Sequence, residues 1–304
     1  ITMVPLNITV GGSEFKDQVD ISSEEFYQRM NEAEELPKTA QPSPYDFALE
    51  YKRLAEEGAD GIISLHIAGV LSGTVESARL AAADAPVDVR VIDTAAASAQ
   101  AGLIVQKACA LRDAGASLDE AEEALKGFIP KSQFMVACDT LENLLKGGRL
   151  SADQVKNANV LNIKPIFTFN EIGALIPISK AKGMRGVIKQ YVSHAQERTE
   201  EQGKQRIRFC HVGNEQGVAD VKEALAQAGN LPLRCHGGNA SWHGRPWRGI
   251  RARTGIKRHK KRKGCAVCPP KVNDGSAVLA GGECAPYHKK ICFGFPSAIG
   301  TVRK

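Results

Sequence analysis

Residues 61–74 read GIISLHIAGVLSGT, and this stretch decides the fold. Its first seven residues are almost continuously apolar, which does not suit a strand with one face in water. We therefore predict a parallel strand over 61–67 that is buried on both faces. An alanine-rich helix over 73–83 follows directly. The turn between them, at Ser72 and Gly73, is the kind of carboxyl-end turn at which open α/β sheets bind ligands.

The same alternation extends in both directions from this stretch. We predict further strands at 1–10, 87–92 and 134–138, and helices beginning at Ser22, Pro44, Ala99 and Ser117. Such alternation predicts a parallel-sheet α/β domain, doubly wound, over residues 1–150. Strands at 164–169 and 175–178 then flank a hairpin turn, and a helix over 185–202, a strand over 206–212 and a helix over 218–228 follow. These elements predict a smaller antiparallel α+β domain over residues 151–232.

The composition is that of a globular protein. The chain has 304 residues, of which 43% are apolar and 24% charged, as expected for two modest soluble domains. We see no apolar run of the ~18 residues that a membrane helix needs, and the first ten residues lack the features of a signal peptide. The expected location is cytoplasmic.

Three polar turns are expected to meet at one edge of the sheet. They hold Thr39 and Gln41, then Ser72, Gly73 and Thr74, then Asp93 and Ser98. The first two turns also have a structural explanation, since Ser72 suits a helix N-cap and 39–44 suits a loop that two prolines stiffen. Lys182, in a basic cluster before the last long helix, fits either a solvated face or an anion site. The residues alone leave these alternatives open.

Several kinds of enzyme are set aside because their motifs are missing. Residues 1–232 contain no GxGxxG, GxxxxGK[ST], HExxH or GxSxG motif, and Cys109, Cys138 and Cys210 stand alone in apolar patterns. The residues alone therefore indicate no catalytic apparatus. A hydrolase or transferase with Ser72 as nucleophile is an alternative that requires His66 or His211 to converge on the Ser72 hydroxyl.

Taken in order, the motifs resemble the DegV family of bacterial fatty-acid-binding proteins. The matching segments are PKTAQPS at 37–43, LSGT at 71–74, VIDT at 91–94 with Ala97-Ser98, DTLENLLKGGRL at 139–150, LNIKPI at 161–166, and the segment with His211, Asn214 and Glu215. The resemblance spans about 230 residues.

This resemblance implies a long-chain fatty acid held in an apolar tunnel between the two domains. The family's carboxylate-binding Thr and Ser fall on Thr39 and Ser72, and the family's Arg before the last long helix falls on Lys182. The resemblance also implies a carrier that presents the carboxylate to a separate fatty acid kinase, with no ATP chemistry of its own. The fatty acid is then the ligand, and no cofactor is expected.

The chain also departs from the family pattern. It starts at what resembles the second strand of the family, after the strand that ends in Asp-Ser. The usual Ser-Ser before LSGT is Ala68-Gly69, and the Ser after Thr39 is Ala40. The closing Thr-His-x-Gly-Pro-Gly motif is absent. Some hydrogen bonds to a ligand head group are therefore expected to be missing.

Residues 233–304 differ from the rest of the chain. They hold 16 Lys+Arg against 2 Asp+Glu, a net charge of +14, whereas residues 1–232 hold 24 against 32, a net charge of −8. Both tryptophans and five of the eight cysteines also lie there. This asymmetry marks a separate basic, irregular tail.

Three interpretations of the tail are open. Cys265 and Cys268 with Cys284 and His288 or Cys292 offer a zinc module, and KRHKKRK at 257–263 suits phosphate backbones, which gives a nucleic-acid-binding protein as the alternative function. The tail also has the composition of a disordered appendage. A frameshift near Leu233 is the interpretation we favour, because it explains the changes in charge, Cys, Trp and His together. It predicts that removing 233–304 leaves thermal stability little changed or improved.

Overall fold

The computed structural model describes residues 1–138, 140–155, 163–203, 206–212, 214–228, 276–281 and 297–302. Its first sheet has the strand order β1-β12-β5-β6. The strands are β1 (Thr2–Val4), β5 (Gly61–His66), β6 (Asp88–Asp93) and β12 (Ser297–Val302). β5 and β6 run parallel, and β12 is antiparallel to both β5 and β1. Every residue of β5 is buried, as the apolar run at 61–67 predicts.

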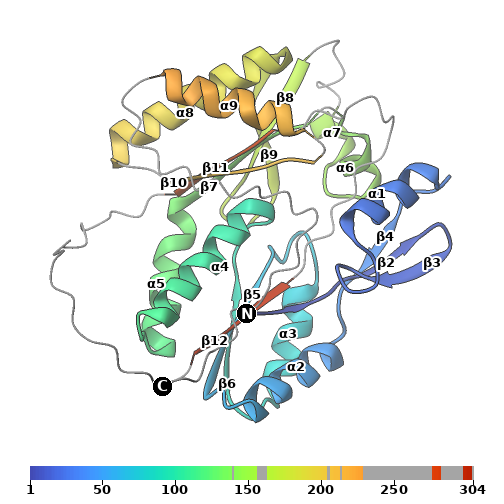
Figure 1. The fold of residues 1–304 in the computed structure, drawn as a ribbon, viewed down its shortest axis with the longest axis vertical. Coiled ribbons are helices and arrows are strands. Elements are labelled where there is room, and N and C mark those ends of the chain that lie inside the picture. The colour runs from blue at the N-terminus through green and yellow to red at the C-terminus, as the bar shows by residue number, and fades with distance from the viewer. Residues whose placement is uncertain are drawn as a thin grey trace, which may run out of the picture.

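Helices cover both faces of this sheet (Figure 1). The helices are α2 (Pro44–Glu56) and α3 (Thr74–Ala82) on one face, and α4 (Ser98–Asp113) and α5 (Leu118–Phe128) on the other. Ile62 of β5 packs with α2 and α3, whereas Ile63 and Leu65 pack with α4 and α5. Because successive side chains of a strand point to opposite faces, both faces need apolar residues. The predicted α/β class is confirmed.

Serine hydroxyl groups cap several of the helices, although Ser72 does not cap α3, whose N-cap is Gly73. Ser43 caps α2 and forms a capping box with Asp46, and Ser117 forms the same box with Glu120 at the start of α5. Ser22 caps α1 (Ser23–Glu32), where its hydroxyl accepts a hydrogen bond from Glu25 N. Each cap satisfies a backbone N–H that the helix leaves without a partner.

The second sheet has the order β10-β11-β7-β8-β9. Its strands are β7 (Ser132–Ala137), β8 (Ile163–Phe169), β9 (Leu175–Lys182), β10 (Arg206–Cys210) and β11 (Ser276–Gly281). The predicted hairpin is present as β8 and β9, which pair antiparallel. The sheet as a whole is mixed, because β10, β11 and β7 run parallel. It includes β7, which lies within residues 1–150, the range predicted for the first domain.

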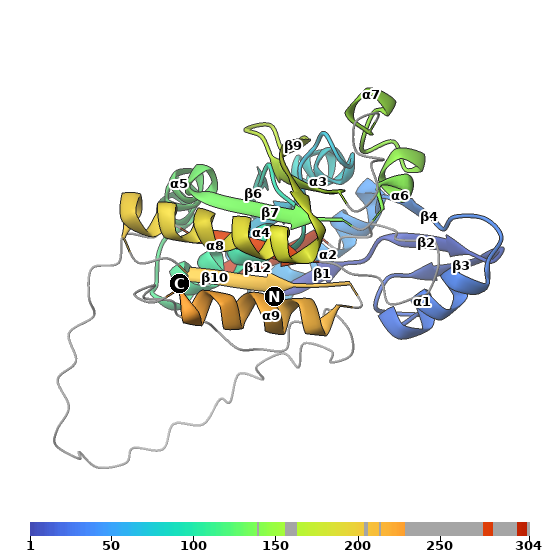
Figure 2. The same ribbon diagram turned by 90° about the horizontal axis from the view of Figure 1, so that it is seen from above.

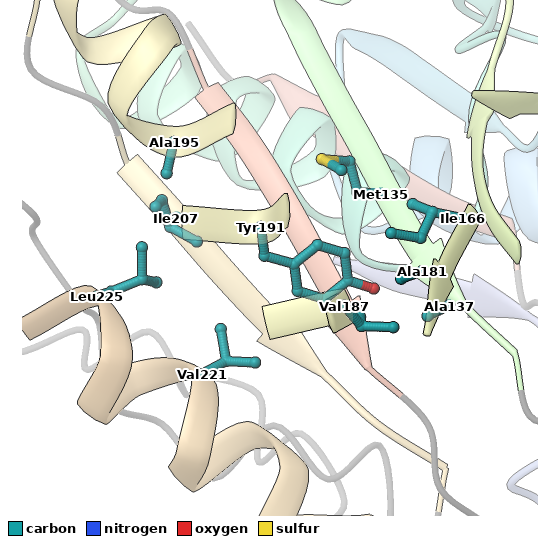
Figure 3. Packing of buried hydrophobic residues seen from close by; sticks show 10 residues of the cluster. All are labelled: Met135, Ala137, Ile166, Ala181, Val187, Tyr191, Ala195, Ile207, Val221 and Leu225. Atoms are coloured by element: carbon teal, nitrogen blue, oxygen red, sulfur yellow. The ribbon is translucent and has the colours of Figure 1, made fainter. Parts of the chain in front are cut away.

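Helices α8 (Gly183–Gln202) and α9 (Glu215–Gln227) cover the outer face of this sheet. Figure 3 shows the core between them, in which Tyr191 of α8 is fully buried beside Met135 of β7 and Val221 of α9. The inner face meets α4, whose Leu103 packs with Phe134 of β7. Since Ile104 of α4 packs against the first sheet, α4 lies between the two sheets.

A third, three-stranded sheet projects at one side of the molecule (Figures 1 and 2). It consists of β2 (Asn7–Val10), β3 (Ser13–Lys16) and β4 (Lys38–Ala40), with α1 packed against it. The prediction of one strand over 1–10 is wrong. The chain breaks between β1 and β2 at Pro5, which has no N–H for a ladder, and the two strands join different sheets.

Short elements complete the fold. They are the 3₁₀ turn Ile129–Lys131, α6 (Glu142–Lys146) and α7 (Ala152–Val155). Strands β11 and β12 come from the tail, where the sequence analysis predicts no strand. They are not predicted because both are short runs of small and apolar residues in a basic, irregular segment. The candidate zinc ligands Cys265, Cys268, Cys284, His288 and Cys292 lie outside the described residues.

Candidate ligand-binding cavity

A cavity of about 250 Å³ lies where the carboxyl-end loops of the first sheet meet β4, β7 and the β8–β9 hairpin. One part of its wall is polar and is formed by Thr39, Gln41, Ser72, Gly73, Ser98 and Arg149. The other part is apolar and is formed by Leu6, Ile67, Leu71, Ala97, Phe134, Val136, Cys138, Leu144, Phe169 and Leu175. Five of the eight residues that the sequence predicts for the site therefore line one cavity.

The Ser72 loop begins where β5 ends. Ser72 N donates to Ala68 O at 3.2 Å, which turns the chain toward α3. The Ser72 hydroxyl is 2.7 Å from Thr74 Oγ1. Thr74 is buried and does not line the cavity, so its contact with the site is through Ser72.

Gln41 crosses this loop at Gly73. Its Nε2 donates to Ser77 Oγ at 3.0 Å. A Cβ on Gly73 would lie 2.2 Å from Gln41 Oε1, closer than any side chain tolerates. The absence of a side chain at Gly73 therefore allows Gln41, from the segment after β4, to lie against the first turn of α3.

Ser98 has a strained backbone conformation. Its φ is +54° and that of Ala95 is +48°, both in the left-handed region that residues with a Cβ rarely adopt. The Ser98 hydroxyl lies 3.6 Å from Cys210 Sγ at the end of β10. Burial raises the pKa of the Cys210 thiol, so this group stays neutral.

Among the described residues, Arg149 brings a cationic group to the cavity. Its Nη2 lies 3.5 Å from Leu71 O, beside the Ser72 loop, and its Nη1 donates to Gly147 O at 2.5 Å. In the sequence, Arg149 follows Gly147 and Gly148 directly after a short helix, a pattern that is typical of a helix end and gives no indication of a binding site. Its approach to Leu71 O links positions 78 residues apart, and no local pattern could have indicated it.

The apolar wall follows the even residues of β7. Phe134 and Val136, with Cys138 directly after the strand, line the cavity because alternate side chains share a face. Phe169 and Leu175 face each other across the β8–β9 pair. The rings of Phe134 and Phe169 stack with centroids 4.9 Å apart and an interplanar angle of 15°.

Besides Thr74, two predicted site residues do not line the cavity. Lys182, at the end of β9, is exposed and does not line the cavity. Asp93, at the end of β6, does not line it either; its two carboxylate oxygens accept hydrogen bonds from Gly69 N and Ala95 N.

The nucleophile alternative has no geometric support in the described residues. His66 Nε2 is 2.7 Å from Ser64 Oγ, which accepts from Tyr51 OH at 2.9 Å, so its ring belongs to a buried network apart from Ser72. His211 Nδ1 accepts from Asn214 N. Neither ring is hydrogen-bonded to Ser72.

The part of the chain that the structure describes holds neither a metal-ligand cluster nor a helix suited to cross a membrane. No group of three or more His, Cys, Asp or Glu side chains is arranged there to hold a metal ion. None of the helices described combines the length and the apolar character needed to cross a membrane.

A sequence profile of the DegV family, described as uncharacterised proteins, matches residues 1–240. The chain belongs to the DegV family. Among DegV relatives, a protein of Thermotoga maritima named "Fatty acid-binding protein" is 34% identical over 207 residues, which cover 67% of this chain and 71% of the relative. The resemblance seen in the motifs is thus confirmed.

Solved DegV structures have the same fold. A fatty-acid-binding DegV protein from Thermus thermophilus matches with a TM-score of 0.67 and 35% identity, covering 76% of this chain and 81% of its own. The Streptococcus pneumoniae fatty acid kinase B3 protein, loaded with linoleic acid, matches with a TM-score of 0.62 and 28% identity, covering 75% and 80%. None of these three relatives is named as a nucleic-acid-binding protein.

Proposed function

We propose that this DegV protein binds a long-chain fatty acid in the cavity and holds it for a partner protein. The observation that carries the proposal is the division of one cavity wall into a hydroxyl-rich part and an apolar part. Binding sites for small ligands have this form, with apolar walls and a few polar groups that fix orientation. Relatives named as fatty-acid-binding proteins support the same ligand.

The carboxylate is proposed to lie at Thr39, Ser72 and Arg149. Two hydroxyl groups can donate to its oxygens, and the guanidinium beside Leu71 O supplies the opposite charge. Gln41, Gly73 and Ser98 complete this end of the wall. Lys182 has no role in this arrangement.

The acyl chain is proposed to lie along β7 and the β8–β9 hairpin. Residues 1–150 then supply the head-group site, and residues 151–232 supply Phe169 and Leu175, which cover the acyl chain. Burial of methylene groups against these side chains contributes about 0.8 kcal/mol each.

The partner is proposed to be a fatty acid kinase, and the protein itself is proposed to be a carrier without cofactor. The name of the Streptococcus pneumoniae relative supports this role. With ATP and oleic acid but no kinase, the purified protein should form no acyl phosphate, which hydroxylamine would trap as a hydroxamate. Hydroxamate formation by the protein alone would contradict the carrier role.

Titration calorimetry of delipidated protein with oleic acid tests the binding site. Thr39→Ala with Ser72→Ala removes two hydrogen bonds to a charged group, each contributing about 1.5–3 kcal/mol, so affinity should fall by roughly a hundredfold or more. The matched control is Thr9→Ala with Ser193→Ala, two exposed hydroxyl groups away from the cavity, and it should bind like the wild type. Equal affinity of both double variants would reject the site.

A further inference from the structure

We infer that Asp93 is a positioning residue, which ties the loop after β5 to the loop after β6 and thereby fixes Ser72 relative to Ser98. The inference rests on the proposed fatty-acid-binding function. It concerns how the head-group site keeps its geometry.

The Asp93 carboxylate bridges the two loops directly. Its Oδ2 accepts from Gly69 N at 2.9 Å and its Oδ1 accepts from Ala95 N at 2.8 Å. Gly69 leads into the loop that carries Ser72, and Ala95 begins the loop that carries Ser98. Hydrogen bonds to an ionised acceptor are roughly twice as strong as those between neutral groups. One side chain therefore holds both hydroxyl-bearing loops.

Backbone bonds beside Asp93 join the same loops. Thr94 N and Thr94 Oγ1 donate to His66 O at 3.0 and 2.7 Å, and Ala68 N donates to Ala96 O at 2.9 Å. The positive φ angles of Ala95 and Ser98 belong to the loop held in this way. Strained conformations persist only where the surroundings determine them, and the Asp93 bond to Ala95 N is part of that determination.

Close packing leaves little freedom around this bridge. A Cβ on Gly69 would lie 3.0 Å from Asp93 Oδ2 and 3.2 Å from Val75 Cγ1. From the second sheet, Gly173 at the tip of the β8–β9 hairpin comes so close that its Cβ would lie 2.3 Å from Ala68 Cβ and 2.8 Å from Ala95 C. The hairpin that carries Phe169 and Leu175 thus rests on the two loops that Asp93 joins.

Asp93 does not suit direct contact with the ligand. Both of its oxygens already accept backbone hydrogen bonds, and it does not line the cavity. A second carboxylate beside it would also be repelled, because like charges raise the free energy of the bound state. Its effect on a fatty acid must therefore pass through Ser72 and Ser98.

The test is Asp93→Asn, with binding of oleic acid and of oleyl alcohol measured by titration calorimetry. Asn keeps one acceptor but places an NH₂ group against the other backbone N–H. The control is Asp88→Asn, at the opposite, exposed end of β6. We expect oleic acid to bind about ten- to a hundredfold more weakly to Asp93→Asn than to the wild type. A loss of this size corresponds to one or two charge-assisted hydrogen bonds between the displaced loops and the carboxylate. Oleyl alcohol should change less than threefold, and Asp88→Asn should change neither.

Hydrogen exchange supplies the second measurement. In Asp93→Asn, exchange of the Gly69 and Ala95 amides should accelerate while amides in the middle of β5 stay protected. Equal losses of acid and alcohol affinity, or no loss of either, would overturn the inference while leaving wild-type fatty acid binding intact. If the wild type itself binds no oleic acid, the proposed function fails and the inference with it.

A milder variant is available in case Asp93→Asn does not fold. Gly69→Ala keeps the Asp93 carboxylate but forces it to move, because the new Cβ would lie 3.0 Å from Asp93 Oδ2. It should lower the acid-to-alcohol affinity ratio in the same direction, by about threefold to tenfold. An unchanged ratio would contradict the positioning role.

Discussion

Replacing Gly73 by Ala tests the contact between Gly73 and Gln41 most directly. The new Cβ would lie 2.2 Å from Gln41 Oε1, whereas ordinary contacts begin at 3.4 Å, so the amide must move by about 1.2 Å. Because Oε1 and Nε2 belong to one amide group, we expect the Gln41 bond to Ser77 Oγ, now 3.0 Å long, to be lost when the amide moves. With φ −69° and ψ 6°, Gly73 itself has a backbone conformation that alanine adopts without strain.

The expected cost follows from these contacts. Loss of the hydrogen bond contributes about 1 kcal/mol, and a displaced side chain adds about 0.5–1 kcal/mol if it leaves its preferred rotamer. Alanine is a poorer N-cap than glycine, which lowers stability, but it also lowers the conformational entropy of the unfolded chain, which raises stability. These two effects are of similar size and largely cancel. We therefore expect Gly73→Ala to lower the free energy of unfolding by about 1–2 kcal/mol.

Urea denaturation in a double-mutant cycle isolates the contact. In a Gln41→Ala background the clash is gone, so Gly73→Ala should cost almost nothing, and the coupling energy should be about 1 kcal/mol or more. Gly127→Ala is the control, because Gly127 lies in α5 with nothing within 4 Å of its Cβ position; it should raise stability by about 0.5–1 kcal/mol. Equal costs of Gly73→Ala in both backgrounds would refute the reasoning.

Three further predictions concern pH, charge and the C-terminal strands. Burial lowers the pKa of His66 to about 3, so below pH 6.5 the unfolded state takes up a proton that the native state does not. The free energy of unfolding should therefore fall by up to about 1.4 kcal/mol for each unit by which the pH is lowered. In urea titrations at pH 5 and 7, His66→Gln should reduce this dependence on pH. Arg149→Gln should weaken oleic acid binding by only about twofold to fivefold, because water screens the charge of the exposed Arg149 side chain. The difference in affinity between the variant and the wild type should shrink in high salt. Removing residues 233–304 deletes β11 from between β10 and β7, so thermal unfolding should shift to lower temperature; an unchanged midpoint would instead favour the frameshift interpretation.

Much of the fold could be predicted from local signals. The run at 61–67 shows a strand buried on both faces, and Ser43 and Ser117 with their acidic partners mark helix starts within one residue. Thr39 and Ser72 line one cavity because turns at the carboxyl ends of parallel strands meet at one sheet edge. Such features depend on a few neighbouring residues.

Other features depend on contacts between distant segments. Arg149 reaches the cavity only because the chain after α6 returns to Leu71 O, and nothing near Arg149 in sequence encodes that return. The partners of Asp93 are backbone N–H groups, which every residue type except proline offers, so its bridging role leaves no trace in composition. The β11 position between β10 and β7 likewise joins segments about 70 and 140 residues apart.

The cavity wall along β7 depends on residue parity. Even positions, Phe134 and Val136, face the cavity, whereas Met135 and Ala137 belong to the core beneath α8. Inserting or deleting one residue within β7 would exchange these two faces, so that both the cavity wall and the packing of the core beneath α8 would be disrupted. Changes of chain length should therefore be confined to turns such as 170–173, and an alignment of DegV sequences should show no gaps within β7.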